Sequence, residues 1–246
     1  MASTPAIPAA TLVTVRDRPG KPPELLMVER AKGMAFAGGA LVFPGGRIDE
    51  GDRQMASDEV DAAAIAAIRE TLEEAAIPVG LSAAPSADLC LELQTELLAD
   101  RPFASMLERH GLELRLEALI PFARWVPKFH ATRRFDTLFF LARAPGPDWT
   151  PRIVEGECSG AFWISAAEAL EREERGGARL IFPTRRNLER LAKHSSFDEM
   201  RADAEAHRIE PISPWVEEIE GENFITIPEG IGYPVTRERL DGLWRG

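Results

Sequence analysis

Three glutamates stand at a spacing that would bring their carboxylates to one face of a helix: Glu70, Glu73 and Glu74. On an α-helix, residues three and four apart lie within about 100° of one another around the axis. Carboxylates this close repel each other, and a hard divalent cation such as Mg²⁺ or Mn²⁺ converts that repulsion into coordination. Arg69 stands four residues before Glu73 and can brace its carboxylate. The run therefore has the residue types and spacing that could hold Mg²⁺ or Mn²⁺.

A glycine turn upstream bears on whether this is a ligand site or an ordinary charged helix. Glutamate-rich helices with nearby arginines are common solvated surfaces, and the helix alone favours that interpretation. Pro44, Gly45 and Gly46, however, end an apolar run, and two glycines allow a positive φ and a close approach of the backbone to a ligand. A plain turn between strand and loop is the alternative. Together the two features favour a site in which a backbone carbonyl of this turn joins the glutamates around the metal.

The helix that carries the glutamates is expected to begin after Ser57, to run through residues 62–76 and to end before Pro78. Ile65, Ile68 and Leu72 cluster on the side opposite the carboxylates, so that side is expected to pack on a core. Ser57 is a good N-cap for this helix.

The rest of the chain alternates strands and helices. Apolar and β-branched runs predict strands at 11–15, 24–30, 40–43, 112–125, 136–142 and 161–164. Capped periodic runs predict a helix at 166–175 after the cap Ser165, and a second helix from the cap Thr184 through about residue 193. This order predicts a layered α/β fold. Residues 85–111, with leucines at largely helical spacing, are expected to be an inserted helical segment, and residues 209–246 a C-terminal extension. We expect a single domain over residues 1–246.

Composition limits the classes of partner. The formal net charge of −11 argues against nonspecific binding to nucleic acid or to an anionic membrane, since both are polyanions. Cys90 and Cys158 fit neither a disulfide framework nor a zinc site, so we expect small buried thiols. No signal peptide and no apolar stretch of about 18 residues is recognisable, so a cytoplasmic protein is expected. A homodimer remains open.

The glycine turn and the acidic run together resemble the Nudix box, whose pattern is Gly, five residues, Glu, seven residues, then Arg-Glu-apolar-x-Glu-Glu-x-Gly-apolar. The first half here runs from Gly46 to Asp52, and the second half is Arg69-Glu70-Thr71-Leu72-Glu73-Glu74-Ala75-Ala76-Ile77. Asp52 replaces the usual glutamate, Thr71 an apolar residue and Ala76 the glycine. Sixteen residues separate Asp52 from Arg69 instead of seven, and the extra nine are expected to form a loop and an added helical turn.

This resemblance implies a Nudix-type α/β/α sandwich with a mixed central sheet, acting as a diphosphatase. The metal ligands that it implies are Glu70, Glu73, Glu74, Gly46 and Asp52. Asp61, which keeps the seven-residue spacing to Arg69, is the alternative to Asp52. The catalytic residues that it implies are Glu73, Glu74 and Arg69, with one glutamate of a later acidic loop, Glu157 rather than Glu155.

Two stretches bear on the substrate. Residues 26–46 resemble the motif that precedes the Nudix box in coenzyme A diphosphatases, and residues 132–141 resemble a segment of their peroxisomal branch, which also carries an insertion inside the Nudix box. The resemblance implies hydrolysis of coenzyme A or acyl-coenzyme A. The alternatives are ADP-ribose or a dinucleotide as substrate, and a non-catalytic nucleotide-sensing regulator.

Candidates for contact with such a substrate come from the same regions. Forked guanidinium donors suit phosphate oxygens, which indicates Arg30, Arg47, Arg133 and Arg134 as binding residues. His130 is a candidate base or phosphate contact, although a structural or surface histidine is the interpretation that its residue type favours. Trp125 and Phe129 are candidate stacking partners of adenine. Core packing explains the two aromatic residues equally well.

Overall fold

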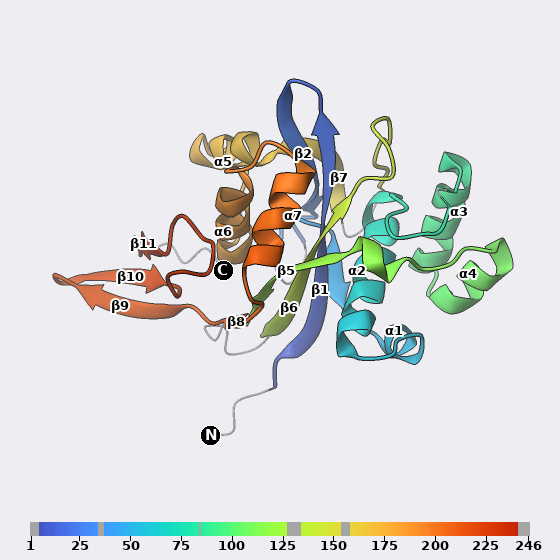
Figure 1. The fold of residues 1–246 in the computed structure, drawn as a ribbon, viewed down its shortest axis with the longest axis horizontal. Helices are drawn as coiled ribbons and strands as arrows, with labels where there is room; N and C mark the ends of the chain where they lie inside the picture. Colours follow the sequence, from blue (N-terminus) through green and yellow to red (C-terminus); the bar gives the residue numbers. More distant parts are fainter. Residues whose placement is uncertain (1–4, 34–36, 84, 127–133, 154–157, 241–246) are drawn as a thin grey trace.

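A mixed β-sheet forms the centre of the protein. The computed structural model describes residues 5–33, 37–83, 85–126, 134–153 and 158–240. The strands follow the order β3-β2-β1-β6-β5-β8, with β4 paired to β1 and β7 paired to β2 (Figure 1). Their bounds are β1 Ile7–Arg18, β2 Lys21–Arg30, β3 Leu41–Val42, β4 Gly45–Arg47, β5 Ile120–Trp125, β6 Phe135–Arg143, β7 Cys158–Ser165 and β8 Pro211–Ile212. β1 runs parallel to β6 and β5 runs parallel to β8, whereas the other pairs are antiparallel.

The hairpin of β1 and β2 explains why this sheet takes helices on both faces. Alternate residues of a strand point to opposite sides of the sheet. Leu12 and Leu26 belong to the apolar core on one side, whereas Val13 and Leu25 belong to the core on the other. All four side chains are fully buried. Strands that are apolar on both faces require cover on both faces.

Helices provide that cover. α1 (Glu50–Gln54), α2 (Glu59–Ala75), α3 (Ala87–Leu98) and α4 (Phe103–His110) lie on one side of the sheet (Figure 1). α5 (Ala166–Glu174), α6 (Phe182–Leu191) and α7 (Phe197–Ala206) lie on the other. The predicted α/β/α sandwich with a mixed central sheet is confirmed. Within the described part of the chain, every helix is too short or too polar to span a bilayer.

Residues 85–111 are helical, as predicted, and form α3 and α4, of which α3 packs on α2. Cys90 of α3 and Cys158 of β7 are both buried, as the composition predicts.

Two helices begin at residues other than those predicted. Asp58, not Ser57, caps α2, and its side chain accepts two hydrogen bonds from backbone N–H groups of the first turn. Ile181 is the N-cap of α6, so Thr184 lies inside the helix. Pro183 favours this earlier start, because the first turn needs no N–H donor from it.

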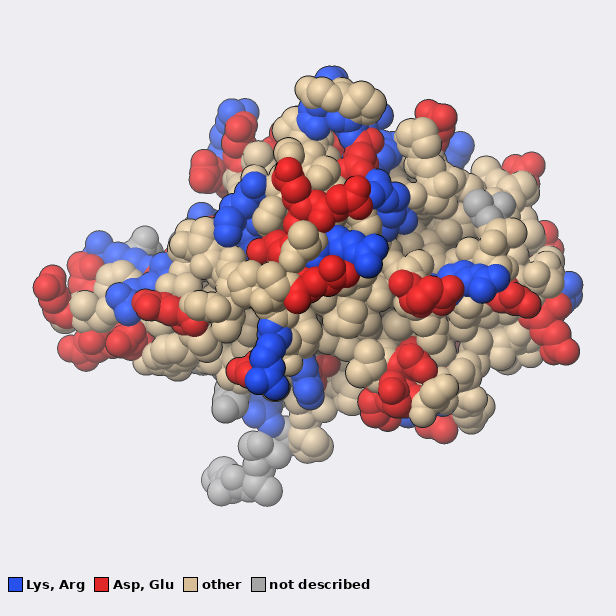
Figure 2. Space-filling model, viewed as in Figure 1, with Lys and Arg blue, Asp and Glu red and all other residues tan. Residues whose placement is uncertain are grey.

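The sequence pattern does not predict α7, which packs Met200 and Ala204 against the sheet. Its outer side is charged: Arg143 of β6 pairs with Asp198 at 2.8 Å, and red and blue side chains are interspersed over the helix in Figure 2. The predicted strand over residues 112–125 is also shorter than expected, because residues 116–118 form a 3₁₀ turn before β5.

The C-terminal extension adds β8 to the central sheet and then forms a sheet of its own. β9 (Trp215–Ile219), β10 (Glu222–Thr226) and β11 (Arg237–Arg239) make an antiparallel sheet that projects from the body (Figure 1). Arg186 of α6, which is 1% exposed, ties it to the body by donating to Glu238 at 2.8 Å.

Candidate active site

The glycine turn lies against the first strand of the sheet. β4 pairs with β1, so that Gly46 lies opposite Ala10 and Gly45 opposite Thr11. A Cβ on Gly45 would lie 2.5 Å from the carbonyl oxygen of Ala10, and a Cβ on Gly46 would lie 2.2 Å from Oε1 of Glu70. Neither Gly45 nor Gly46 has a positive φ. Of the two properties that glycine allows, the turn uses the close approach, because a strand lies against Gly45 and a carboxylate lies against Gly46.

The carboxylate of Glu70 lies in the space that Gly46 leaves open. Nη1 of Arg69 donates a hydrogen bond to its Oε1 at 2.9 Å. Burial raises the pKa of Glu70 to about 7, with Glu73 and Asp49 raising it further and Arg69 opposing the change. Since burial and like charge disfavour the ionised form, a bound cation would stabilise this carboxylate.

Glu74 is the most enclosed of the three helix glutamates, with its side chain 6% exposed against 15% for Glu70 and 23% for Glu73. Its Oε2 accepts a hydrogen bond from the backbone N–H of Gly45 at 3.1 Å. Its Oε1 lies 3.9 Å from Nη1 of Arg30 at the end of β2. Glu70 and Glu74 therefore both contact the glycine turn.

Arg69 joins the acidic residues to one another. Its Nε and Nη2 donate to the two carboxylate oxygens of Asp52, both at 3.0 Å, and its Nη1 lies 3.5 Å from Oε2 of Glu73. Nη2 also donates to the carbonyl oxygen of Arg47 at 3.0 Å. Burial lowers the pKa of Arg69, but the hydrogen bond to Asp52 and the nearby negative charges more than offset this and hold the pKa above its ordinary value. Arg69 is thus a permanent cation at the centre of the cluster.

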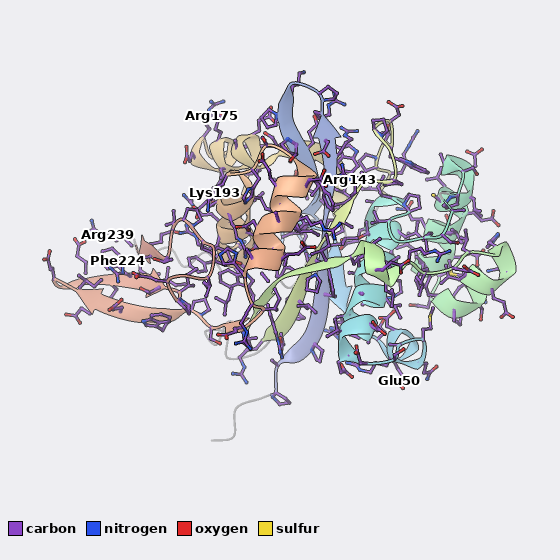
Figure 3. The ribbon with its side chains drawn as sticks, in the orientation of Figure 1. Glu50, Arg143, Arg175, Lys193, Phe224 and Arg239 are labelled. Carbon is purple, nitrogen blue, oxygen red and sulfur yellow. The ribbon has the colours of Figure 1, made fainter. Side chains whose placement is uncertain are left out.

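Asp52 faces Arg69 with both of its oxygens. It is 1% exposed, and its Oδ2 also accepts a hydrogen bond from the backbone N–H of Asp49 at 2.9 Å. Glu50, on the same short helix, points to solvent (Figure 3). The residues added between Asp52 and Arg69 form the end of α1, a turn and the first part of α2.

Asp61 lies far from the cluster. It is in the first turn of α2, nine residues before Glu70, a separation of about 13 Å along a helix axis.

The residues predicted to bind the substrate or to assist catalysis lie in different parts of the structure. Arg47 is exposed on β4 beside Ala9 of β1, and Arg134 lies at the same end of β1, where its carbonyl accepts from Ile7. Trp125 is 1% exposed, and its Nε1 donates to Asn187 and Tyr233, so it packs in the core and does not offer a surface for adenine. Glu155, Glu157, Arg133, His130 and Phe129 lie outside the described residues.

Sequence reasoning missed two residues of this region. Asp49 lies 3.5 Å from Nη2 of Arg69 and is the N-cap of α1, where its side chain and that of Asp52 form a capping box. That capping pattern is a signal in the sequence. Gln94 of α3 donates to the carbonyl oxygen of Glu73 at 2.9 Å. No local pattern predicts this contact, because the two residues meet only through the packing of α3 on α2.

Comparison with known proteins identifies the family of this chain. No protein-family model matches the sequence. The crystal structure of a NUDIX hydrolase from Alicyclobacillus acidocaldarius is 31% identical, covering 82% of this chain and 97% of that chain with a TM-score of 0.69. The chain belongs to the Nudix hydrolases. A Caenorhabditis elegans relative, nudix hydrolase 7, is 27% identical in an alignment that covers 82% of this Nudix chain and 66% of the relative's length.

Proposed function

We propose that the protein is a Mg²⁺- or Mn²⁺-dependent diphosphatase that cleaves a nucleoside-diphosphate-linked compound, with coenzyme A or acyl-coenzyme A as the favoured substrate. The observation that carries the proposal is the convergence of Glu70 and Glu74 on the glycine turn, with Glu73 joined to them through Arg69. A solvated charged helix would not require a glycine under one carboxylate and a backbone donor on another.

The donor set fits a hard divalent cation. Carboxylate oxygens are the ligands that Mg²⁺ and Mn²⁺ prefer, and Gly46 keeps its backbone within reach of the Glu70 carboxylate. Glu70, Glu73, Glu74 and the Gly46 carbonyl would hold the metal. When bound, it supplies a Lewis acid that polarises a phosphoryl oxygen and lowers the pKa of a bound water.

Arg69 and Asp52 act as positioning residues in this proposal. Arg69 orients the carboxylates of Glu70 and Glu73 and offsets their repulsion in the unloaded site. Asp52 orients Arg69 through a forked pair of hydrogen bonds, and both of its oxygens are committed to that partner. This geometry favours a role in support of the metal site for Asp52 over direct ligation. Glu157 remains our candidate for the assisting carboxylate.

Arg30 is the best supported candidate for binding the diphosphate. Its Nε is buried and has no hydrogen-bond partner among the described residues, and its Nη1 lies 3.9 Å from Glu74. A guanidinium with an unused donor beside the proposed metal ligands suits a phosphate oxygen. Arg47, Arg133 and Arg134 are proposed for more distant groups of the substrate.

Coenzyme A is favoured on the resemblance of residues 26–46 and 132–141 to coenzyme A diphosphatases. ADP-ribose or a dinucleotide is the alternative substrate. A non-catalytic nucleotide sensor is less well supported, because all three helix glutamates are present, with Glu70 and Glu74 beside the glycine turn and Glu73 beside Arg69.

A substrate panel tests the proposal. Coenzyme A, an acyl-coenzyme A, ADP-ribose and a dinucleotide would each be incubated with Mg²⁺, Mn²⁺ or EDTA, and the products identified by mass spectrometry. We expect turnover only with metal and cleavage within the diphosphate, fastest for coenzyme A. Good hydrolysis of ADP-ribose without turnover of coenzyme A would refute the substrate. Binding of a nucleotide without any turnover would refute the reaction.

A further inference from the structure

We propose that Gln94 is a positioning residue of the metal site, acting from the inserted helix α3 on the last turn of α2. The inference rests on the proposed function, because it concerns how the proposed ligands Glu73 and Glu74 are held. It also gives the helical insertion at residues 85–111 a role in the reaction.

Gln94 satisfies a carbonyl that α2 itself leaves open. The last four carbonyls of an α-helix have no partner inside the helix. α2 ends at Ala75, so the carbonyl of Glu73 is one of these. Nε2 of Gln94 donates to that oxygen at 2.9 Å, and the Gln94 side chain is fully buried. The backbone of a proposed metal ligand is therefore fixed by a side chain from the neighbouring helix.

The same amide fixes a second segment. Nε2 of Gln94 also donates to the carbonyl oxygen of Arg152 at 2.9 Å. The backbone N–H of Arg152 in turn donates to the carbonyl oxygen of Ala75 at 2.9 Å. Gln94, the end of α2 and Arg152 thus form a closed set of hydrogen bonds. In the sequence Arg152 precedes the acidic residues Glu155 and Glu157 by only a few positions.

The chemistry of Gln94 distinguishes this contact from ordinary core packing. Its Oε1 is buried without a hydrogen-bond partner among the residues that the structure describes. A buried acceptor in that state costs stability, and an apolar residue of the same shape would avoid the cost. The glutamine is therefore better suited to fixing two carbonyls than to filling space.

The test compares Gln94→Met with Leu97→Ala. Methionine keeps the length of the side chain and removes both donors, whereas Leu97 is buried on the same helix, 5% exposed, and has no part in the hydrogen-bonded set. The readouts are the Kd for Mn²⁺ alone by isothermal titration calorimetry, kcat and KM on the best substrate of the panel, and Tm. Supporting residues of metal sites typically change metal affinity by about 10–100-fold when removed.

We expect Gln94→Met to weaken Mn²⁺ binding at least about tenfold and to lower kcat more than it raises KM. Leu97→Ala should lower Tm by several degrees and leave Mn²⁺ affinity and kcat near those of the wild type. Wild-type Mn²⁺ affinity and kcat in Gln94→Met, measured below its Tm, would overturn the inference. Equal losses in Leu97→Ala would also overturn it, since destabilisation would then explain both.

Glu74→Gln separates this failure from failure of the proposed function. If Glu74→Gln abolishes turnover and Gln94→Met is normal, only the role of Gln94 is wrong. If the wild type binds no Mn²⁺, or if Glu74→Gln is unaffected, the metal assignment is wrong and the role of Gln94 fails with it.

Discussion

Replacing Gly46 by alanine is expected to disable the site without unfolding the protein. The new Cβ would lie 2.2 Å from Oε1 of Glu70, and ordinary contact begins at 3.4 Å, so the carboxylate must move by 3.4 − 2.2 = 1.2 Å. A displacement of about 1 Å in a catalytic group typically costs about 10²-fold in rate. The colliding atoms are the end of a flexible side chain, so the free energy of unfolding should change little.

Two neighbouring glycines provide matched controls. A Cβ on Gly45 would meet backbone atoms, the Ala10 carbonyl oxygen at 2.5 Å and the Thr11 Cα at 2.8 Å, which cannot swing aside. Gly45→Ala should therefore destabilise the fold by about 1–3 kcal/mol or more. Gly51 lies in α1 with nothing within 4 Å of a Cβ, so Gly51→Ala should preserve activity and add up to about 1 kcal/mol of stability.

The assay is kcat/KM with Mg²⁺ on the best substrate of the panel, alongside thermal unfolding of each variant. The reasoning is refuted if Gly46→Ala keeps more than a third of the wild-type kcat/KM. It is also refuted if its loss of activity only follows a loss of folded protein, as expected for Gly45→Ala.

Three further predictions concern the same helix and its support. Arg69→Met leaves the carboxylate of Asp52 buried without its cation, which should cost about 3–5 kcal/mol and lower Tm by roughly 6–20 °C in calorimetry; a change below 2 °C would contradict this. Without metal, in EDTA, the pKa of Glu70 is raised from 4.5 to about 7 in the folded protein, so between these pH values the folded state binds more protons than the unfolded state. The free energy of unfolding in urea should therefore fall as pH rises from 4.5 to 7. Glu70→Gln should remove that slope, and an unchanged slope would assign it to other groups. Burial raises the pKa of Cys90 to about 11, so iodoacetamide at pH 8 should modify it only after unfolding, as read by mass spectrometry; rapid modification of the native protein would contradict the fold around α3.

The sequence predicts those parts of the fold that depend on local pattern. The β1–β2 hairpin, the inserted helices and α2 are governed by apolar periodicity, and each is present within a few residues of its predicted range. The positions that differ depend on tertiary context. Ser57 and Asp58 are both good N-cap residues, so the sequence does not decide between them, and Asp58 caps α2 in the structure. α7 is stabilised by packing on the sheet instead of by a strong apolar pattern.

The same distinction between local pattern and tertiary packing applies to the candidate site. Helix geometry alone predicts that Glu70, Glu73 and Glu74 share a face, and the glycine turn indicates where that face is directed. Two hydrogen bonds join Arg69 to Asp52 across the insertion between α1 and α2. Residue spacing does not predict them, because they depend on how the two helices pack. The hydrogen bond from Gln94 to the carbonyl of Glu73 depends on how α3 packs on α2, so the sequence pattern does not predict it.

Activity of the Glu73→Gln/Glu74→Gln double variant tests the central claim most directly. Glutamine keeps the shape of each side chain and an oxygen that can accept from Gly45, but removes the charge that would bind the metal. Because metal and charge stabilisation supply most of the rate in this class of reaction, we expect kcat/KM with Mg²⁺ or Mn²⁺ to fall by at least about 10³-fold, with the fold retained. Diphosphatase activity within tenfold of the wild type would contradict the account.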